Sequence, residues 1–190
     1  MEPQLVLASA SPRRALILKK LGLRFRVAVA DVDESMAPGE DAAAAAERLA
    51  RSKAQAIAAR ETLPVLAADT LVVCDGRALG KPASAEDAAR MLRELAGRDH
   101  EVVTGVCLVA SGVVRSGLEK TRVSIAPMRD AEIARYVATG EPMDKAGAYH
   151  IDGLGAVFVS GVSGSPSNVA GLPVRLVARL CAEAGLSLLP

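Results

Sequence analysis

The chain has 190 residues, of which 51% are hydrophobic, and its 23 Lys and Arg balance 22 Asp and Glu. This size and composition allow a full hydrophobic core, while the balanced charge excludes a broad field that would hold a nucleic-acid polymer or an anionic membrane. The apolar runs are short and the N-terminal residues lack the pattern of a signal peptide, so we expect no membrane span.

Short apolar runs and amphipathic stretches alternate along the chain. They predict, in order, a strand at 5–8, a helix at 12–21, a strand at 25–29, a helix at 41–60, a strand at 66–73, a hairpin strand at 77–79, a helix at 84–95, strands at 101–109 and 113–125, a helix at 130–139, a strand at 156–161 and a helix at 173–184. Ser11 and Pro12 are typical of a helix N-terminus, and Asp75-Gly76 is typical of a tight hairpin. Because helices, parallel-type strands and hairpins are mixed, we expect an α/β fold with an extended mixed sheet.

The cysteines and aromatic residues limit the chemistry further. Cys74, Cys107 and Cys181 lie far apart, and an odd, dispersed set forms neither a disulfide framework nor a zinc site. We therefore expect a reducing, cytoplasmic environment. With two Tyr, two Phe and no Trp, a bound base would be read by hydrogen bonds and backbone contacts instead of by stacking.

The first candidate site is the junction Ser9-Ala10-Ser11-Pro12-Arg13-Arg14 between the first strand and the first helix. Free backbone N–H groups, the helix dipole, two hydroxyls and two guanidinium groups would converge there on a polyphosphate. The alternative interpretation is a capped helix with two solvated arginines.

The second candidate is Asp69-Thr70, a polar pair inside an otherwise apolar strand. A carboxylate buried without a partner would cost several kcal/mol, so a metal ion or a proton taken from water would explain it. A structural carboxylate that caps nearby backbone groups explains it equally well.

The remaining charged residues carry little signal one by one. Lys53, Lys81 and Lys145 each lie beside a small or turn residue, and Glu34 and Asp144 are ordinary acidic residues in isolation. The segment 141–149 mixes charge with glycine, which favours a binding loop over a plain connection. His100 and His150 are too isolated to form a metal pair, and we expect both histidines to be polar residues at the ends of strands.

In their order along the chain, these segments resemble the Maf family of nucleotide pyrophosphatases from residue 5 to about residue 175. The segments that carry the resemblance are Leu7 to Arg14, Asp33-Glu34, Arg48-Leu49-Ala50 with Lys53-Ala54, Ala68-Asp69-Thr70, Gly80-Lys81-Pro82, Thr104-Gly105-Val106, Glu141-Pro142 with Asp144 to Tyr149, and Gly171-Leu172-Pro173. The resemblance implies one domain over residues 1–190, with two lobes around a deep cleft and a sheet like that of the inosine triphosphate pyrophosphatases.

The resemblance also implies roles for individual residues. Ser9, Ser11, Arg13 and Arg14 would hold the phosphates, and Lys53 and Lys81 would neutralise the triphosphate. Glu34 would help to bind a divalent cation, Mg²⁺ or Mn²⁺, for which hard oxygen ligands are suited. Asp69 resembles the proton acceptor of the family, and its residue type allows it to be a metal ligand instead.

The expected reaction is hydrolysis of a nucleoside triphosphate to the monophosphate and pyrophosphate. Arg13, Thr70 and the loop 144–149 that includes Lys145 resemble the branch that acts on dTTP and UTP. Asp152 departs from it, because that branch usually has Gln there, and an acid is closer to the branch that acts on 7-methyl-GTP. An acid would also suit the amino group of cytosine or a modified pyrimidine.

Two alternatives stay open at this point. One is a 7-methyl-GTP pyrophosphatase of the same family. The other is a weakly active nucleotide-binding regulator of septum formation, against which the retained Asp69, Lys53 and Lys81 argue. Many members of the family are dimers, so a homodimer is also a possible partner arrangement.

Overall fold

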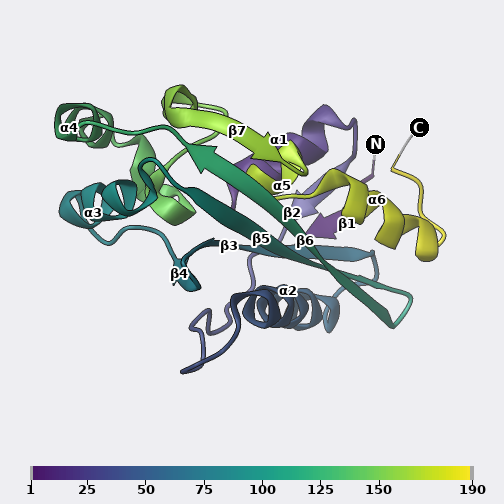
Figure 1. The fold of residues 1–190 in the computed structure, drawn as a ribbon. Helices are drawn as coiled ribbons and strands as arrows, with labels where there is room; N and C mark the ends of the chain where they lie inside the picture. The colour runs from purple at the N-terminus through teal and green to yellow at the C-terminus, as the bar shows by residue number, and fades with distance from the viewer. Residues whose placement is uncertain (1, 189–190) are drawn as a thin grey trace. The chain divides into compact units, whose positions relative to one another are not determined.

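A computed structural model describes residues 2–188 as a mixed α/β fold (Figure 1). The strands form one sheet in the order β2-β1-β3-β5-β6-β7, with β4 paired to β3. The strands are β1 (Leu5–Leu7), β2 (Phe25–Val27), β3 (Val65–Cys74), β4 (Arg77–Leu79), β5 (Asp99–Ala110), β6 (Val113–Ile125) and β7 (Val159–Ser163). β1 is parallel to β2 and β3, whereas β4 and β7 are antiparallel to β3 and β6, so the predicted mixed sheet is confirmed.

The helices correspond closely to the predicted ones. They are α1 (Pro12–Lys20), α2 (Ala42–Ala58), α3 (Ala85–Leu95), α4 (Asp130–Ala138), α5 (Pro166–Val169) and α6 (Val174–Glu183), together with the 3-10 helices η1 (Glu141–Asp144), η2 (Ala146–Ala148) and η3 (Leu154–Phe158). Within residues 2–188, no helix has both the length and the apolar character needed to cross a membrane.

The chain divides into two compact units. Unit 1 comprises Met1–Asp69, Thr104–Glu119 and Gly171–Pro190, and unit 2 comprises Thr70–Val103 and Lys120–Ala170. The cleft and the single domain implied by the family resemblance stay predictions.

In unit 1, the central strands are buried on both faces. Leu7 and Leu66 point to one face, where they pack with residues of α1 and α6, and their neighbours Val6 and Val65 point to the other, where they pack with residues of α2. Since successive residues of a strand face opposite sides, covering both faces requires the continuous apolar run that the sequence shows.

Helix α2 lies unusually close to the sheet of unit 1. Its first turn is capped by Asp41, whose carboxylate accepts hydrogen bonds from the backbone of Ala43 and Ala44. A Cβ atom at Gly105 of β5 would lie 2.3 Å from the carbonyl oxygen of Ala46. The absence of a side chain at Gly105 therefore sets the depth at which α2 packs.

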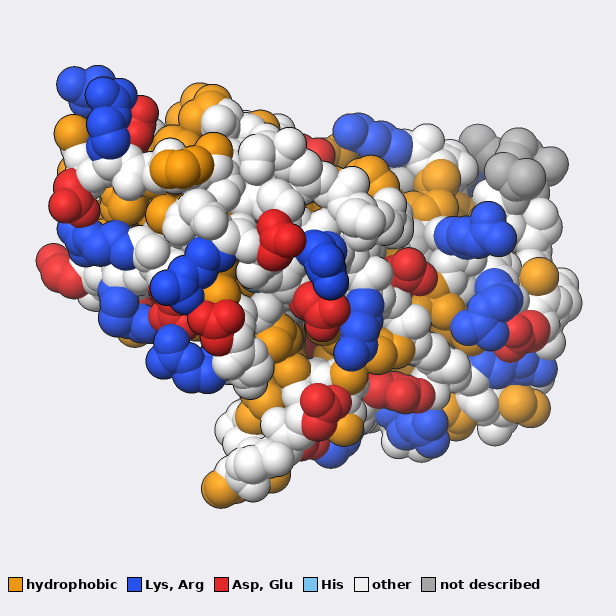
Figure 2. Space-filling view, viewed as in Figure 1, with side chains coloured by type: hydrophobic (Ala, Val, Ile, Leu, Met, Phe, Trp, Pro, Cys, Tyr) orange, Lys and Arg blue, Asp and Glu red, His pale blue; other side chains and the backbone are white. Residues whose placement is uncertain are grey.

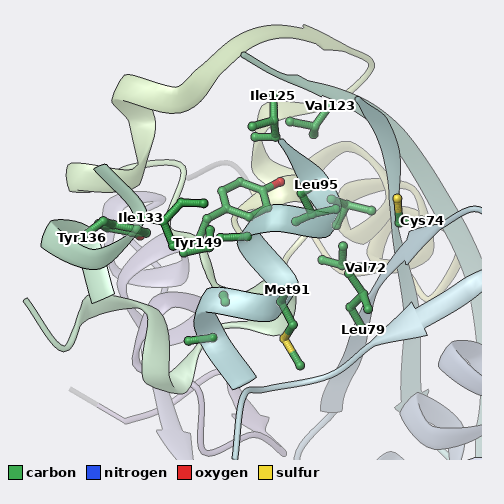
Figure 3. Close-up of a cluster of buried hydrophobic side chains, with 14 of the residues drawn as sticks. Val72, Cys74, Leu79, Met91, Leu95, Val123, Ile125, Ile133, Tyr136 and Tyr149 are labelled. Atoms are coloured by element: carbon green, nitrogen blue, oxygen red, sulfur yellow. The ribbon is translucent and has the colours of Figure 1, made fainter. Parts of the chain in front are cut away.

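Unit 2 has a separate hydrophobic core around α3 (Figure 3). Met91 and Leu95 of α3 pack with Val72 of β3 and with the ring of Tyr149. Ser84 caps α3 by accepting a hydrogen bond from the backbone N–H of Asp87, at the start of the helix predicted over 84–95. The tight hairpin was also predicted: Asp75 has a φ of 48° and Gly76 a φ of 76°.

The expected strand at 156–161 was wrong in its first part. Residues Leu154–Phe158 form the 3-10 helix η3, and β7 begins only at Val159. The physical reason is a capture of this segment by Glu141, whose carboxylate accepts hydrogen bonds from the backbone N–H groups of Leu154 and Gly155. The backbone N–H of Ala156, the first residue of the expected strand, then donates to the carbonyl oxygen of Gly153 instead of to a neighbouring strand.

Three smaller differences concern the ends and the loops. The strand at 25–29 ends at Val27, the short helix α5 lies between the predicted strand at 156–161 and the predicted helix at 173–184, and the loop 141–149 contains η1 and η2. On the surface in view in Figure 2, basic and acidic side chains are interspersed.

Candidate active site

The junction between β1 and α1 has no side-chain cap on the helix. Ser11 occupies the N-cap position with an extended backbone, and its side chain makes no capping hydrogen bond. The hydroxyl oxygen of Ser9 instead accepts a hydrogen bond from the backbone N–H of Ser11 at 3.2 Å. A helix start that its own N-cap does not satisfy can bind an anion.

The two arginines of this junction differ in their surroundings. Arg14 is 9% exposed, and it donates from Nε to the carbonyl oxygen of Gly171 at 2.8 Å and from Nη1 to Ser9 Oγ at 2.9 Å. Arg13 is partly exposed. Burial lowers the pKa of Arg14, an effect that Asp69 and Glu34 oppose and that Arg13 reinforces, so these four charged groups share one electrostatic environment.

Lys53 links two carboxylates in the same unit. Its Nζ lies 2.7 Å from Asp69 Oδ1 and 2.8 Å from Glu34 Oε2. Lys53 and Asp69 are each 7% exposed, whereas 59% of the Glu34 side chain is exposed. Asp69 is thus a buried carboxylate with a cationic partner, which removes most of the cost of burying it alone.

The loop that carries Glu34 is held by Arg48 of α2. Arg48 donates from Nε and Nη2 to the carboxylate of Glu40 and from Nη2 to the carbonyl oxygen of Ser35. Asp33 accepts a hydrogen bond from the backbone of Ser35. The hydrogen bonds from Arg48, and then the one from the backbone of Ala37, lower the pKa of Glu40 to about 2.

Unit 2 carries the other predicted residues on connected loops. Lys81 is exposed beside Gly80, whose carbonyl oxygen accepts a hydrogen bond from the backbone of Gly147. Lys145 is buried, pairs with Asp144 and donates to the carbonyl oxygen of Glu141 at 3.4 Å. Thr70 lies in β3, directly after Asp69.

Asp152 is exposed on a loop that Glu141 organises. The carboxylate of Glu141 accepts hydrogen bonds from Tyr136 Oη at 2.8 Å, Leu154 N at 3.0 Å and Gly155 N at 2.9 Å. Burial by itself would raise the pKa of Glu141, but these hydrogen bonds outweigh it and lower the pKa. Glu141 had no predicted role from the sequence and entered only through the segment 141–149 and the resemblance at Glu141-Pro142.

Glycine is required where this loop passes the Glu141 side chain. A Cβ atom at Gly153 would lie 2.4 Å from Glu141 Oε2, and one at Gly155 would lie 2.5 Å from the hydroxyl of Tyr136. Tyr136 Oη also accepts a hydrogen bond from the backbone of His150. The spacing Gly153-Leu154-Gly155 therefore serves close packing.

The two histidines have structural surroundings. His100 is 3% exposed and its Nε2 lies 2.9 Å from the hydroxyl of Tyr149. His150 Nδ1 lies 4.0 Å from Glu141 Oε2. Among residues 2–188, no group of three or more His, Cys, Asp or Glu side chains is arranged to hold a metal ion.

The predicted site residues therefore fall into two sets. Unit 1 contains the candidate phosphate-binding residues Ser9, Ser11, Arg13 and Arg14. It also contains the three linked charged residues Glu34, Lys53 and Asp69. Unit 2 holds Thr70, Lys81, Lys145 and Asp152. These features define an α/β protein in which a strand–helix junction of the kind that binds anions shares an electrostatic environment with a buried carboxylate–ammonium pair.

Comparison with known proteins places the chain in a family. Residues 4–184 match the family described as "Maf-like protein", and the chain belongs to it. It is 51% identical over 183 residues to a dTTP/UTP pyrophosphatase from Koribacter versatilis, covering 96% of this chain and 95% of the relative. It is 53% identical over 187 residues to a dTTP/UTP pyrophosphatase from Anaeromyxobacter sp. (strain Fw109-5), covering 96% and 90%.

A solved structure shows a more distant likeness. The Staphylococcus aureus Ham1 protein is 19% identical, with a TM-score of 0.47 over 64% of this chain and 71% of that one. This likeness is too remote to carry an argument about function.

Proposed function

We propose that this protein hydrolyses dTTP and UTP to the nucleoside monophosphate and pyrophosphate. The observation that carries the proposal is the buried Lys53–Asp69 pair in the electrostatic environment of Arg14. It is supported by the relatives named dTTP/UTP pyrophosphatase, which share about half of the residues over nearly the whole chain.

The chemistry follows from what such a reaction needs. Water attacks the α-phosphorus and pyrophosphate leaves, so negative charge must be met by cations and donors that are already in place. The α1 N-terminus with Ser9, Ser11 and Arg13 would bind phosphate oxygens. Lys53 would neutralise charge, and Asp69 would take the proton of the attacking water or hold a metal ion.

A divalent cation is part of the proposal, and the residues fit one. Glu34 and Asp69 direct two carboxylates to the same ammonium group, and two hard oxygen donors plus substrate phosphates are typical of Mg²⁺ or Mn²⁺ binding. When bound, the cation would neutralise phosphate charge and polarise the reacting phosphorus. The structure leaves both roles of Asp69 possible.

The base is proposed to be read in unit 2. Asp152 and Thr70 are the candidate contacts, and the acid at 152 is the observation that favours 7-methyl-GTP as the second candidate substrate. Lys81 and Lys145 stay predicted substrate contacts. A catalytically weak regulator of septum formation is less well supported, since Lys53 and Asp69 are retained as a close pair.

We also infer a cytoplasmic setting, supported by the three cysteines, which are free and buried. The homodimer stays a prediction.

The experiment that tests the function is a nucleotide screen on the purified full-length chain. Pyrophosphate release would be measured for UTP, dTTP, CTP, 7-methyl-GTP and ATP with Mg²⁺, with Mn²⁺ and after chelation. We expect UTP and dTTP to have the highest kcat/KM and chelation to stop turnover. No release from any nucleotide would refute the proposal, and 7-methyl-GTP in first place would establish the second candidate.

A further inference from the structure

The hydroxyl of Ser9 is committed as a hydrogen-bond donor. Its oxygen accepts one hydrogen bond from the backbone N–H of Ser11 at 3.2 Å and another from Arg14 Nη1 at 2.9 Å. A serine hydroxyl has two acceptor lone pairs and one proton. With both acceptor positions used, the proton of Ser9 can only donate, and within residues 2–188 no acceptor receives it.

This arrangement selects for an anion. Ser9 is 7% exposed, and in such a buried setting an acceptor with negative charge forms the stronger hydrogen bond with a hydroxyl donor. A serine without these two donors could rotate its proton toward a local carbonyl and present a lone pair to the ligand. Two donors on its oxygen prevent that rotation.

Arg14 is fixed from the other side by a distant part of the chain. Its Nε donates to the carbonyl oxygen of Gly171 at 2.8 Å, across 157 residues of sequence. Gly171 has a φ of 99°, a backbone conformation that L side chains rarely adopt, so its carbonyl direction depends on glycine. One guanidinium therefore joins the segment before α6 to the hydroxyl of Ser9.

We propose that Arg14 is a positioning residue which acts through Ser9: held by the Gly171 carbonyl, it keeps the Ser9 hydroxyl as an obligatory donor to a phosphate oxygen. This inference rests on the proposed phosphate site and gives Arg14 a different role from Arg13. The fork of the guanidinium is essential, because a lysine ammonium has the same charge without the planar geometry that reaches both partners.

The test measures the affinity for inorganic pyrophosphate by calorimetry, which needs neither a base nor turnover. Arg14→Lys and Ser9→Ala are each expected to weaken binding about tenfold, the effect of one hydrogen bond to a charged group. The double variant should be no weaker than either single one, since both remove the same interaction. The matched control is Arg13→Lys with Ser9→Ala, for which we expect the two effects to multiply.

Urea unfolding of each variant separates positioning from stability. A purely structural Arg14 would lower the free energy of unfolding while the folded variant bound pyrophosphate normally, and that result would overturn the inference. Multiplying effects of Arg14→Lys and Ser9→Ala would overturn it as well. Should Arg14→Lys not fold, Gly171→Ala tests the same hydrogen bond from the side of its acceptor. We expect Gly171→Ala to weaken pyrophosphate binding about tenfold. Adding Gly171→Ala to Ser9→Ala should weaken binding no further than Ser9→Ala does alone.

The outcomes distinguish this inference from the proposed function. A wild-type chain that binds pyrophosphate but hydrolyses no nucleotide would refute the function and leave the role of Arg14 testable by the same cycle. A wild-type chain that does not bind pyrophosphate would refute the inference.

Discussion

Lys53 Nζ lies 2.7 Å from Asp69 Oδ1, and each of the two residues is only 7% exposed. The pair joins the middle of α2 to the centre of β3. Removing one partner of such a pair leaves an unpaired buried charge, which costs about 3 to 5 kcal/mol, whereas changing it to a neutral isostere keeps the packing. The same pair thus contributes to the fold and to the proposed chemistry.

Asp69→Asn is expected to lower hydrolysis of UTP by at least about 10²-fold, because it keeps the shape and removes the charge that either a base or a metal ligand needs. Release of pyrophosphate under saturating Mg²⁺ measures the loss. Asp75→Asn is the matched control, since Asp75 forms an exposed pair with Arg98 in the β3–β4 hairpin. More than a tenth of wild-type turnover in Asp69→Asn would contradict the assignment.

Gly105→Ala should move α2 and with it Lys53. The added methyl would meet the backbone of Ala46, which cannot move aside as a flexible side chain does. We expect a loss of about 1 to 3 kcal/mol in the free energy of unfolding, measured in urea, together with lower kcat. In the control Gly161→Ala, the new Cβ would meet only the side chain of Ser124 at an ordinary 3.7 Å. Equal stability of the two variants would show that α2 does not depend on this contact.

Asp152→Gln is expected to raise the preference for UTP over CTP. An ionised carboxylate only accepts hydrogen bonds, whereas an amide restores a donor for the uracil carbonyl. Specificity constants for UTP, dTTP, CTP and 7-methyl-GTP on both proteins measure the change. If the ratio of UTP to CTP stays the same, Asp152 does not contact the base.

Glu141→Gln should disturb the loop that presents Asp152. The amide keeps one acceptor oxygen but turns an NH₂ group toward the donors Tyr136 Oη, Leu154 N and Gly155 N. We expect discrimination between UTP and CTP to weaken at least about threefold, with hydrogen exchange at Leu154 and Gly155 accelerated by the loss of about 1 kcal/mol of hydrogen bonding. Unchanged exchange at both amides would show that Glu141 does not hold the loop.

His100 makes the stability depend on pH. Burial lowers its pKa from 6.5 to about 4 in the folded chain, so the unfolded chain binds the proton first as the pH falls. The stability that the neutral ring contributes is fully present above about pH 6.5 and is lost between about pH 6.5 and 4, up to about 3 kcal/mol. In His100→Gln, the free energy of unfolding, measured in urea at a series of pH values, should change less between pH 6.5 and 4 than in the wild type. Identical dependence on pH in the two proteins would contradict the lowered pKa of His100.

Local sequence patterns determined most of the secondary structure, whereas the roles of the candidate site residues came from the family resemblance and stay predictions. Ser11-Pro12 and Asp75-Gly76 mark a helix start and a hairpin turn where predicted, since each restricts the backbone of only a few neighbouring residues. The apolar run at 66–73 predicted the strand β3. Residues 156–158 were mispredicted as strand because Glu141, 13 and 14 residues before Leu154 and Gly155, binds the amides of these two residues at the start of the 3-10 helix.

Only the tertiary structure decided which side chains work together. From the residues alone, Asp69 was a candidate as a polar break in a strand while Lys53 and Glu34 were ordinary charged residues, and the packing of α2 against β3 joins the three in a linked triplet. The resemblance gave Arg13 and Arg14 the same expected role in holding the phosphates. The hydrogen bond from Arg14 to the carbonyl oxygen of Gly171, 157 residues away, gives Arg14 different surroundings from those of Arg13. Contacts between residues so far apart depend on how helices and strands pack, and a local pattern of residue types carries no information about that geometry.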